Sequence, residues 1–471
     1  MNRFGVIALV AAVLVSSQTL HAQGDGAQSA PLVLTLEDAL QYALDHYPAV
    51  RAALEQVNIS TANISVAKSA YLPRVDSLWQ TNRATANNVF GQLLPQSVIP
   101  ALSGPVLPDS STSPVWGSAT GALFSWEPFD FGLRGATIRE AEAGIARARA
   151  DEALTRLDVQ NAVGAAFLAV VAAQQAVVAA EADVQRREVL ARAARTLVDN
   201  QLRPGAEASR ADAERAAART RAIQGGQALL FAQATLARTL GLTSGAVSVN
   251  TAGLLDRVPS ATSPTSAQSE HPLTQSRQAA VDQARAHEGV LDATDRPRIY
   301  LQSSVFARGS GASPDGVFDG DADGLGLERA NWAAGFQIVF PNLFDFASLR
   351  ARRAASAAFT RVERARYDEA VLTVTSQQQT ADALADAARA IAQNTPVQLA
   401  AAQQSEAQAR ARFEAGLSSI TEVAEAQSLL VQAEYQDAVA RVDVWRALLA
   451  QAIARGNVTS FVNLLRGSGV R

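Results

Sequence analysis

The sequence predicts a mixed fold in which the β-strands of a membrane barrel continue into long α-helical hairpins, with the whole unit present twice. Three observations predict it. The chain begins with a secretory leader, several landmarks recur in one order, and two very long stretches are rich in alanine and poor in proline. The 471 residues include no cysteine, and the formal net charge is −4. A disulfide framework and a thiolate metal site are therefore excluded, and no basic excess indicates nucleic-acid binding.

Residues 1–22 have the pattern of a secretory signal peptide. Arg3 supplies the positive charge, residues 4–15 are apolar, and Leu20, His21 and Ala22 form a plausible cleavage site. The alternative is a buried N-terminal helix. No later stretch offers the roughly 18 uninterrupted apolar residues of a membrane helix, so entry into a membrane would have to use β-strands.

An internal duplication organises the rest of the chain. Four landmarks recur in the same order, at separations of 224, 224, 215 and 211 residues. They pair Pro48 with Pro272, Pro73 with Pro297, Asp130 with Asp345, and Gly205 with Gly416. We therefore expect two copies of one unit, differing in loop length.

Each copy is expected to contain a helix, two strands and a helical hairpin. The first repeat spans 31–242, a linker follows at 243–268, the second repeat spans 269–456, and 457–471 form a C-terminal tail. In the first repeat a helix covers about 36–70, strands about 74–86 and 116–127, and the hairpin about 133–241. In the second the helix covers about 272–294, strands about 298–308 and 331–340, and the hairpin about 347–455.

The strand-like stretches alternate between apolar and polar residues. Trp332, Phe336, Ile338 and Phe340 share one face of the last strand, and Trp116, Phe124 and Trp126 share one face of the second. This period of two, with aromatic residues near strand ends, is typical of membrane strands. The alternative is an edge hairpin on a soluble sheet. Four strands cannot close a barrel, so we expect oligomers: two chains would supply eight strands and three would supply twelve.

Long helices follow each strand pair. Residues 133–202 contain no proline and would reach about 100 Å as one helix. Alanine recurs every seven residues, which predicts a closely packed coiled-coil seam in each hairpin. The positions are Ala162, Ala169 and Ala176 in the first hairpin, and Ala426, Ala433, Ala440 and Ala447 in the second. A helical rod without a channel is the simpler interpretation of these helices alone.

Each hairpin is expected to turn at a glycine, near 205 and near 416. Gly205 and Gly416 would supply a left-handed turn. A serine then precedes an acid by three residues, Ser209 before Asp212 and Ser419 before Glu422, which predicts a capping box at the start of each second helix.

Taken together, the order and duplication of these motifs resemble the TolC-type outer-membrane efflux proteins over residues 36–456. The resemblance implies a homotrimer with a twelve-stranded barrel in outer-membrane lipid and an α-helical barrel across the periplasm. It also implies docking to a periplasmic adaptor protein and an inner-membrane pump. From the balanced charge and the lack of catalytic motifs we expect no partner nucleic acid, no cofactor and no enzymatic activity. A periplasmic coiled-coil adaptor is the competing interpretation, but an adaptor would carry one hairpin between two β-rich halves.

The resemblance also assigns residues at the tunnel mouth. The two acids that ring the periplasmic entrance in this family correspond to Glu422 and Glu425, and the matching acid on the first hairpin is Asp212. Family members close the mouth with a tyrosine and an arginine, whose positions hold Phe413 and Ser418 here. Neither residue can make the same bonds.

Other motifs indicate little chemistry. Residues 319–328 begin like a calcium loop, but Ala330 stands where the bidentate glutamate belongs, which favours a flexible external loop. The histidines show no metal-binding spacing, and no nucleophile–base set or phosphate loop is present. The sequence does not identify the exported cargo.

Overall fold

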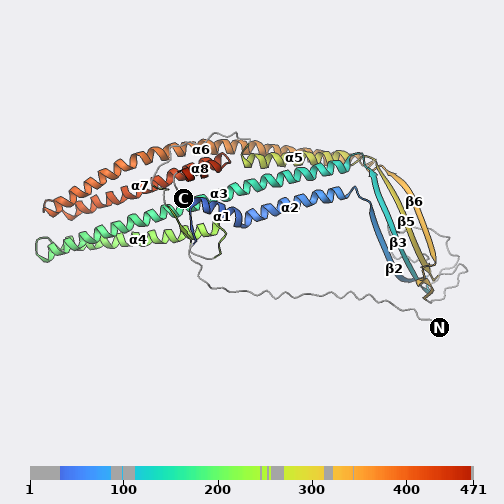
Figure 1. Ribbon diagram of the computed structural model, residues 1–471, viewed down its shortest axis with the longest axis horizontal. Coiled ribbons are helices and arrows are strands. Elements are labelled where there is room, and N and C mark those ends of the chain that lie inside the picture. The colour runs from blue at the N-terminus through green and yellow to red at the C-terminus, as the bar shows by residue number, and fades with distance from the viewer. Residues whose placement is uncertain are drawn as a thin grey trace.

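The computed structural model describes residues 32–85, 98, 112–243, 247–251, 254–255, 270–311, 322–342 and 344–467. The predicted signal peptide lies outside this part of the chain. The described residues form an elongated molecule, with a β-sheet at one end and a helical shaft that ends in two hairpin tips (Figure 1).

The sheet contains four antiparallel strands in the order β2-β3-β5-β6. Their bounds are β2 Arg74–Thr85, β3 Pro114–Phe129, β5 Arg298–Ser310 and β6 Arg329–Val339. Strands of the two repeats meet at the β3–β5 pair, where Ala119 is opposite Arg308. β2 and β6 are the edges of the sheet, and no described strand pairs with their outer sides.

The two faces of this sheet differ in polarity. One face carries apolar side chains that are largely exposed, including Trp79 at 75%, Trp332 at 79% and Phe336 at 76%. The other face carries polar residues in register, such as Arg308 opposite Arg329, together with a small buried apolar cluster around Phe306. An apolar outer face and a polar inner face are the pattern of a barrel wall with lipid on one side and water on the other.

The helical shaft is built from two hairpins and shorter helices beside them (Figure 1). The first hairpin consists of α3 (Leu133–Asp199) and α4 (Gly205–Thr239), and the second of α6 (Phe346–Glu414) and α7 (Ile420–Ala454). α2 (Pro48–Ser69) and α5 (Pro272–Ala293) pack against α3 near the sheet. The predicted fold class, strands of a barrel combined with long helical hairpins, is confirmed.

The two hairpins have equivalent backbones, and equivalent positions in them are 215 residues apart in the sequence. Asp130 and Asp345 stand at the strand–helix corners, and α4 and α7 each contain 35 residues. Gly241, with φ +80°, and Gly456, with φ +73°, follow these helices in left-handed conformations. The spacing of 211 that paired Gly205 with Gly416 is therefore wrong, and the true counterpart of Gly416 is Gln201.

The largest apolar core lies midway along the shaft and joins both repeats. Trp445 is 1% exposed, donates from Nε1 to the carbonyl of Leu254 at 2.6 Å, and meets the Phe461 ring edge-on at 6.1 Å. Phe461 belongs to α8 (Thr459–Gly467), so part of the predicted tail 457–471 is a packed helix. α8 is short and packs against α7, the helix that precedes it in the chain.

Other local predictions are also corrected. The helix expected over 36–70 is broken at Tyr47 into α1 (Leu36–His46) and α2, because Pro48 starts a new helix and disfavours helical backbone before it. The expected linker contains β4 (Val247–Val249), which pairs in parallel with β1 (Leu32–Leu34). A short 3₁₀ turn, η2 (Ala322–Leu325), precedes β6.

The alanine pattern holds in one hairpin and fails in the other. Ala433 and Ala440 are 1% and 4% exposed in the second hairpin, whereas Ala162 in the first is exposed. α3 instead buries larger side chains such as Phe167. This helix also contains an 18-residue window with a mean hydropathy of 1.9, long and apolar enough by composition to cross a membrane. Gln174 and Gln175 interrupt its apolar run, so α3 does not offer 18 uninterrupted apolar residues. Because α3 packs against α4, α5 and α7, its apolar residues serve the core of the shaft.

Candidate functional site at the hairpin tips

The two hairpin tips turn with the same backbone geometry. Gln201 has φ +59° and Gly416 has φ +77°. In each tip the next residue donates its N–H back across the turn, from Leu202 to Leu197 at 2.9 Å and from Leu417 to Arg412 at 2.8 Å. These bonds satisfy carbonyls at the helix end and hold a left-handed residue in place. Glycine adopts this conformation without strain, and Gln201 does so because the turn bonds enforce it.

The predicted capping boxes are wrong in both tips. Gly205 is the first residue of α4, with Pro204 as its cap, and the Ser209 hydroxyl donates to the carbonyl of Gly205 at 3.4 Å. Ser419 does occupy the cap position of α7, yet its side chain makes no capping hydrogen bond. The sequence pattern placed serines near both starts, but the first serine lies a full turn inside its helix.

The acids of the first tip are compensated by arginines. The residue equivalent to Glu422 at the separation of 215 is Glu207, whose carboxylate lies 3.5 Å from the guanidinium of Arg203. Asp212, which the resemblance placed opposite Glu422, forms ion pairs with Arg195 and with Arg215, the second at 3.3 Å. The first tip therefore presents little uncompensated negative charge from these two acids.

The acids of the second tip are exposed and have no partner among the described residues. Glu422 and Glu425 are exposed, and neither carboxylate has an ion pair or hydrogen bond with another described residue. The backbone N–H of Glu422 donates to the carbonyl of Ser419 at 3.2 Å, so the start of α7 does not use the glutamate side chain. Since they are three residues apart, both acids lie on one side of α7.

Phe413 and Ser418 are buried between the tips. Phe413 is 4% exposed and packs in a small core with Leu190 of α3 and Val423 of α7. Arg203 of the first tip donates to the carbonyl of Ser418 at 3.2 Å, and its guanidinium lies 5.5 Å from the centre of the Phe413 ring. These two positions therefore join the tips by packing and through Arg203.

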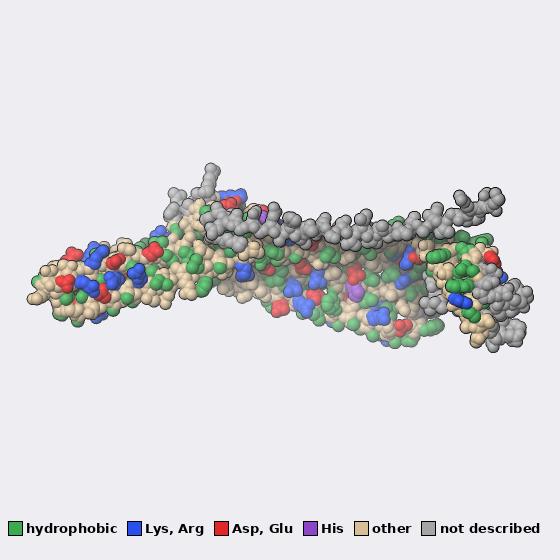
Figure 2. All heavy atoms as spheres, turned by 90° about the horizontal axis from the view of Figure 1, so that it is seen from below, with side chains coloured by type: hydrophobic (Ala, Val, Ile, Leu, Met, Phe, Trp, Pro, Cys, Tyr) green, Lys and Arg blue, Asp and Glu red, His purple; other side chains and the backbone are tan. Residues whose placement is uncertain are grey.

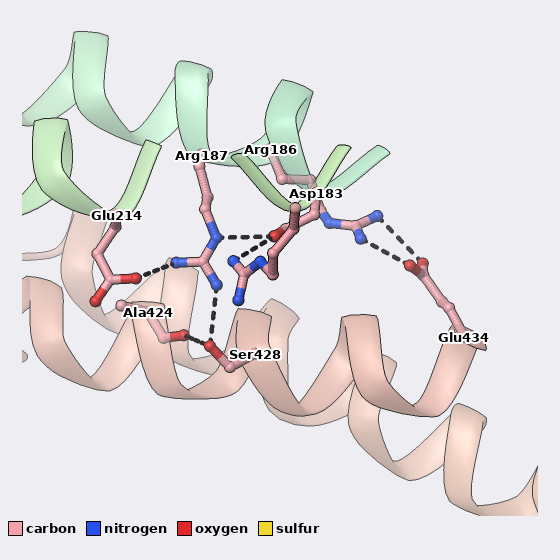
Figure 3. Close-up of polar contacts among 8 residues, drawn as sticks. Asp183, Arg186, Arg187, Glu214, Ala424, Ser428 and Glu434 are labelled. Atoms are coloured by element: carbon pink, nitrogen blue, oxygen red, sulfur yellow. Dashed lines mark hydrogen bonds and ion pairs between the residues drawn. The ribbon is translucent and has the colours of Figure 1, made fainter. Parts of the chain in front are cut away.

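A buried group of charged residues joins the hairpins farther up the shaft (Figure 3). Arg187 of α3 is 1% exposed and contacts Asp183 at 2.8 Å, Glu214 of α4 at 2.8 Å and the hydroxyl of Ser428 of α7 at 2.9 Å. This group is not among the residues predicted from the sequence, although Asp183 and Arg187 have the i, i+4 spacing of a helical ion pair.

A second contact beside this group also joins α3 to α7. Arg186 binds Glu434 with two parallel hydrogen bonds, of 3.1 and 2.7 Å (Figure 3). Arginine and carboxylate in this arrangement form a strong, directional pair. The second hairpin is thus attached to the first by charged contacts as well as by its apolar seam.

No metal centre is assigned. Within the described ranges no three His, Asp or Glu side chains form a group that could hold a metal ion. Residues 319–321 of the calcium-like loop lie outside those ranges, so the interpretation of that loop stays a prediction.

The sheet has one exposed apolar face and is continued by two long helical hairpins. This architecture defines a class of channel proteins in which a β-barrel joins a set of helical hairpins. The sequence profile of the outer membrane efflux protein family matches residues 39–242 and 264–454. The chain belongs to this family, as the resemblance predicted. It is an efflux channel protein of the outer membrane that extends into the periplasm, which confirms the predicted location and transport role.

Solved structures show the same fold at low sequence identity. The chain is similar to VceC of Vibrio cholerae, with 17% identity over 90% of this chain and 96% of that one, and a TM-score of 0.68. It is similar to CmeC of Campylobacter jejuni, with 14% identity over 92% and 89%, and a TM-score of 0.72. The open state of MtrE of Neisseria gonorrhoeae matches at 17% identity over 90% and 89%, with a TM-score of 0.68. A search of curated protein sequences gave no significant match.

Proposed function

We propose that three copies of this chain form an exit duct that carries small molecules or proteins from a periplasmic adaptor and an inner-membrane pump to the outside. The main support for the proposal is that the β-sheet of one chain is not closed into a barrel. It has four strands, two unpaired edges among the described residues and one apolar face. A sheet edge exposed to lipid would leave backbone groups unpaired, and three sheets joined edge to edge would give a closed barrel of twelve strands.

The helical shaft has open edges that match those of the sheet. Near the sheet the helices lie in the order α2, α3, α5, α6, so α2 and α6 are the outer members. Both carry exposed apolar residues, for example Val66 at 67% on α2 and Phe359 at 51% on α6. Contact between α2 of one copy and α6 of the next would cover these residues and close a helical barrel under the β-barrel.

The hairpin tips suit contact with another protein. Leu202 and Leu417, at the ends of the two hairpins, are 68% and 72% exposed. Large exposed apolar side chains at a tip have no partner within the described chain and are typical of interaction surfaces. The proposed partner is the periplasmic adaptor, which would join the duct to the pump.

The open acids of the second tip would form the entrance. Three copies would bring six carboxylates, from Glu422 and Glu425, around a narrow mouth. Rings of acidic side chains favour cations in pores. The missing capping bond of Ser419 supports this role, because capping does not account for Glu422.

The oligomeric state tests the proposal. Light scattering of the mature chain in detergent is expected to give the mass of three chains after subtraction of the detergent. A folded, monodisperse monomer would contradict the duct. The alternatives, a periplasmic adaptor or a helical rod, have no use for an exposed apolar sheet face, and both would be expected to purify without detergent.

A further inference from the structure

A hollow lies between the two hairpins near their tips. It has a volume of about 480 Å³ and is lined by residues of α3 and α6, with Gln427 of α7. Cavities of a few hundred Å³ are large enough to hold one small organic molecule. Gln427 follows Glu425 by two residues, or about 200° around α7, so the hollow and the acids of the proposed entrance lie on opposite sides of this helix. All lining residues belong to one chain, so the hollow does not depend on the proposed trimer.

Much of the wall of this hollow is apolar. Val189, Leu190 and Leu197 contribute to it from α3, and Phe413 contributes from α6. Val189 is 58% exposed, and Ala193 beside it on α3 is also exposed, so this part of the wall is not covered by the chain itself. Figure 2 shows hydrophobic side chains among charged ones at the tip end of the shaft. Water is displaced favourably from such a wall by the hydrocarbon part of a ligand.

Two buried oxygen atoms at the hollow lack a hydrogen-bond donor. They are Oε1 of Glu406 and Oε1 of Gln427, and neither has a partner among the described residues. The Glu406 side chain is 8% exposed, and Gln427 is 3% exposed. The guanidinium of Arg410 lies 3.8 Å from Glu406, which is too far for a hydrogen bond, and the Arg410 side chain is 57% exposed. Because a buried carboxylate without donors is costly, a ligand that supplies N–H groups and a positive charge would be stabilised here.

The charges around the hollow also favour a cation. Arg186 lines it, but this arginine is already bound to Glu434 by two hydrogen bonds (Figure 3). Glu414 lines it as well, is exposed, and has no ion pair with another residue in the described part of the chain. Arg410 therefore offsets one of the two acids, Glu406 and Glu414. One negative charge remains, and a ligand with one positive charge would balance it.

We propose that this hollow binds a small amphipathic amine, a molecule with an apolar part and a protonated amino group. The amino group would donate to the Glu406 carboxylate and to the amide oxygen of Gln427, while Arg410 turns towards the solvent. The apolar part would cover Val189 and contact the Phe413 ring. A neutral molecule would leave the carboxylate without a countercharge, and an amine without an apolar part would leave the wall in contact with water. The bound amine would connect α3 with α6 and α7 and so stabilise the contact between the two tips.

Calorimetric titration tests the class of ligand. Phenylbutylamine would be titrated into the full protein in a neutral detergent, beside phenylbutanol, which has no charge, and butylamine, which has no ring. A titration into micelles without protein would be subtracted. Phenylbutylamine is expected to bind at least about tenfold more tightly than either of the others, because it alone uses both parts of the site. Equal affinity of phenylbutylamine and either reference compound would overturn the proposal.

Two variants locate the site. Glu406→Gln keeps the size of the side chain and removes its charge, and it is expected to weaken the binding of phenylbutylamine by at least about tenfold. Glu369→Gln, at an exposed position of α6 nearer the sheet, is the matched control and should bind as the parent does. Ala193→Leu fills the hollow from an exposed position, so it should abolish binding and leave the unfolding midpoint unchanged. An affinity equal to that of the parent in either folded variant would place the amine elsewhere and overturn the proposal.

Discussion

The two hairpin tips share a backbone and differ in chemistry. Both turn through a left-handed residue and continue into helices of 35 residues. In the first tip, Glu207 is paired with Arg203, whereas its counterpart Glu422 in the second tip is unpaired among the described residues. Duplication has thus preserved the turn while the side chains diverged, which supports a structural role for the first tip and an entrance role for the second.

The largest expected effect lies in the buried charges that join the hairpins. Arg187→Ala should cost about 3 kcal/mol of unfolding free energy, because it leaves buried Asp183 with one arginine fewer. The change would be measured as the midpoint of unfolding in detergent. Arg192→Ala, at an exposed position of the same helix, should change stability by less than about 0.5 kcal/mol. Equal midpoints for the two variants would mean that the charged group does not hold the hairpins together.

Overpacking of the alanine seam should have an intermediate effect on stability and would test the difference between the two hairpins. Ala433→Leu or Ala440→Leu should each cost roughly 1–3 kcal/mol, since both alanines are buried against neighbouring helices. The exposed Ala162 of the first hairpin should tolerate leucine better. If Ala162→Leu lowers the unfolding midpoint as much as the other two, the first hairpin also has a seam, covered by another copy of the chain.

Exchange of the turn residues should have the smallest effect on stability. Gly416→Ala should cost about 1 kcal/mol, because alanine resists left-handed backbone. Gln201→Gly should gain up to about 1 kcal/mol for the same reason, less the extra freedom of glycine in the unfolded chain. Both would be measured as shifts of the unfolding midpoint in opposite directions. Shifts of the same sign would show that the two turns are not energetically equivalent.

The tips also show what the sequence could and could not predict. Alternating aromatic residues and duplicated proline landmarks predicted the strands, because lipid on one face requires that period. The pattern misplaces the first tip, because glycine is the residue expected in a left-handed turn, whereas Gln201 adopts that conformation and is held by the hydrogen bonds of the turn. The pattern does not predict the β1–β4 pair or α8 because these elements are short: β1 gains its partner from a distant part of the chain, and α8 is a helix of only nine residues packed on α7. Whether Glu422 forms an ion pair depends on which arginines lie near it, and only the folded chain determines those neighbours.

Ion selectivity of the assembled protein tests the central claim most directly. The double variant Glu422→Gln, Glu425→Gln would be compared with the parent in a planar bilayer under a salt gradient. We expect the parent to prefer cations and to be blocked by multivalent cations, and the double variant to lose both properties. Glu207→Gln, which removes the paired acid at the equivalent position, should leave selectivity unchanged. A double variant that assembles correctly and keeps the selectivity and block of the parent would contradict the acidic entrance.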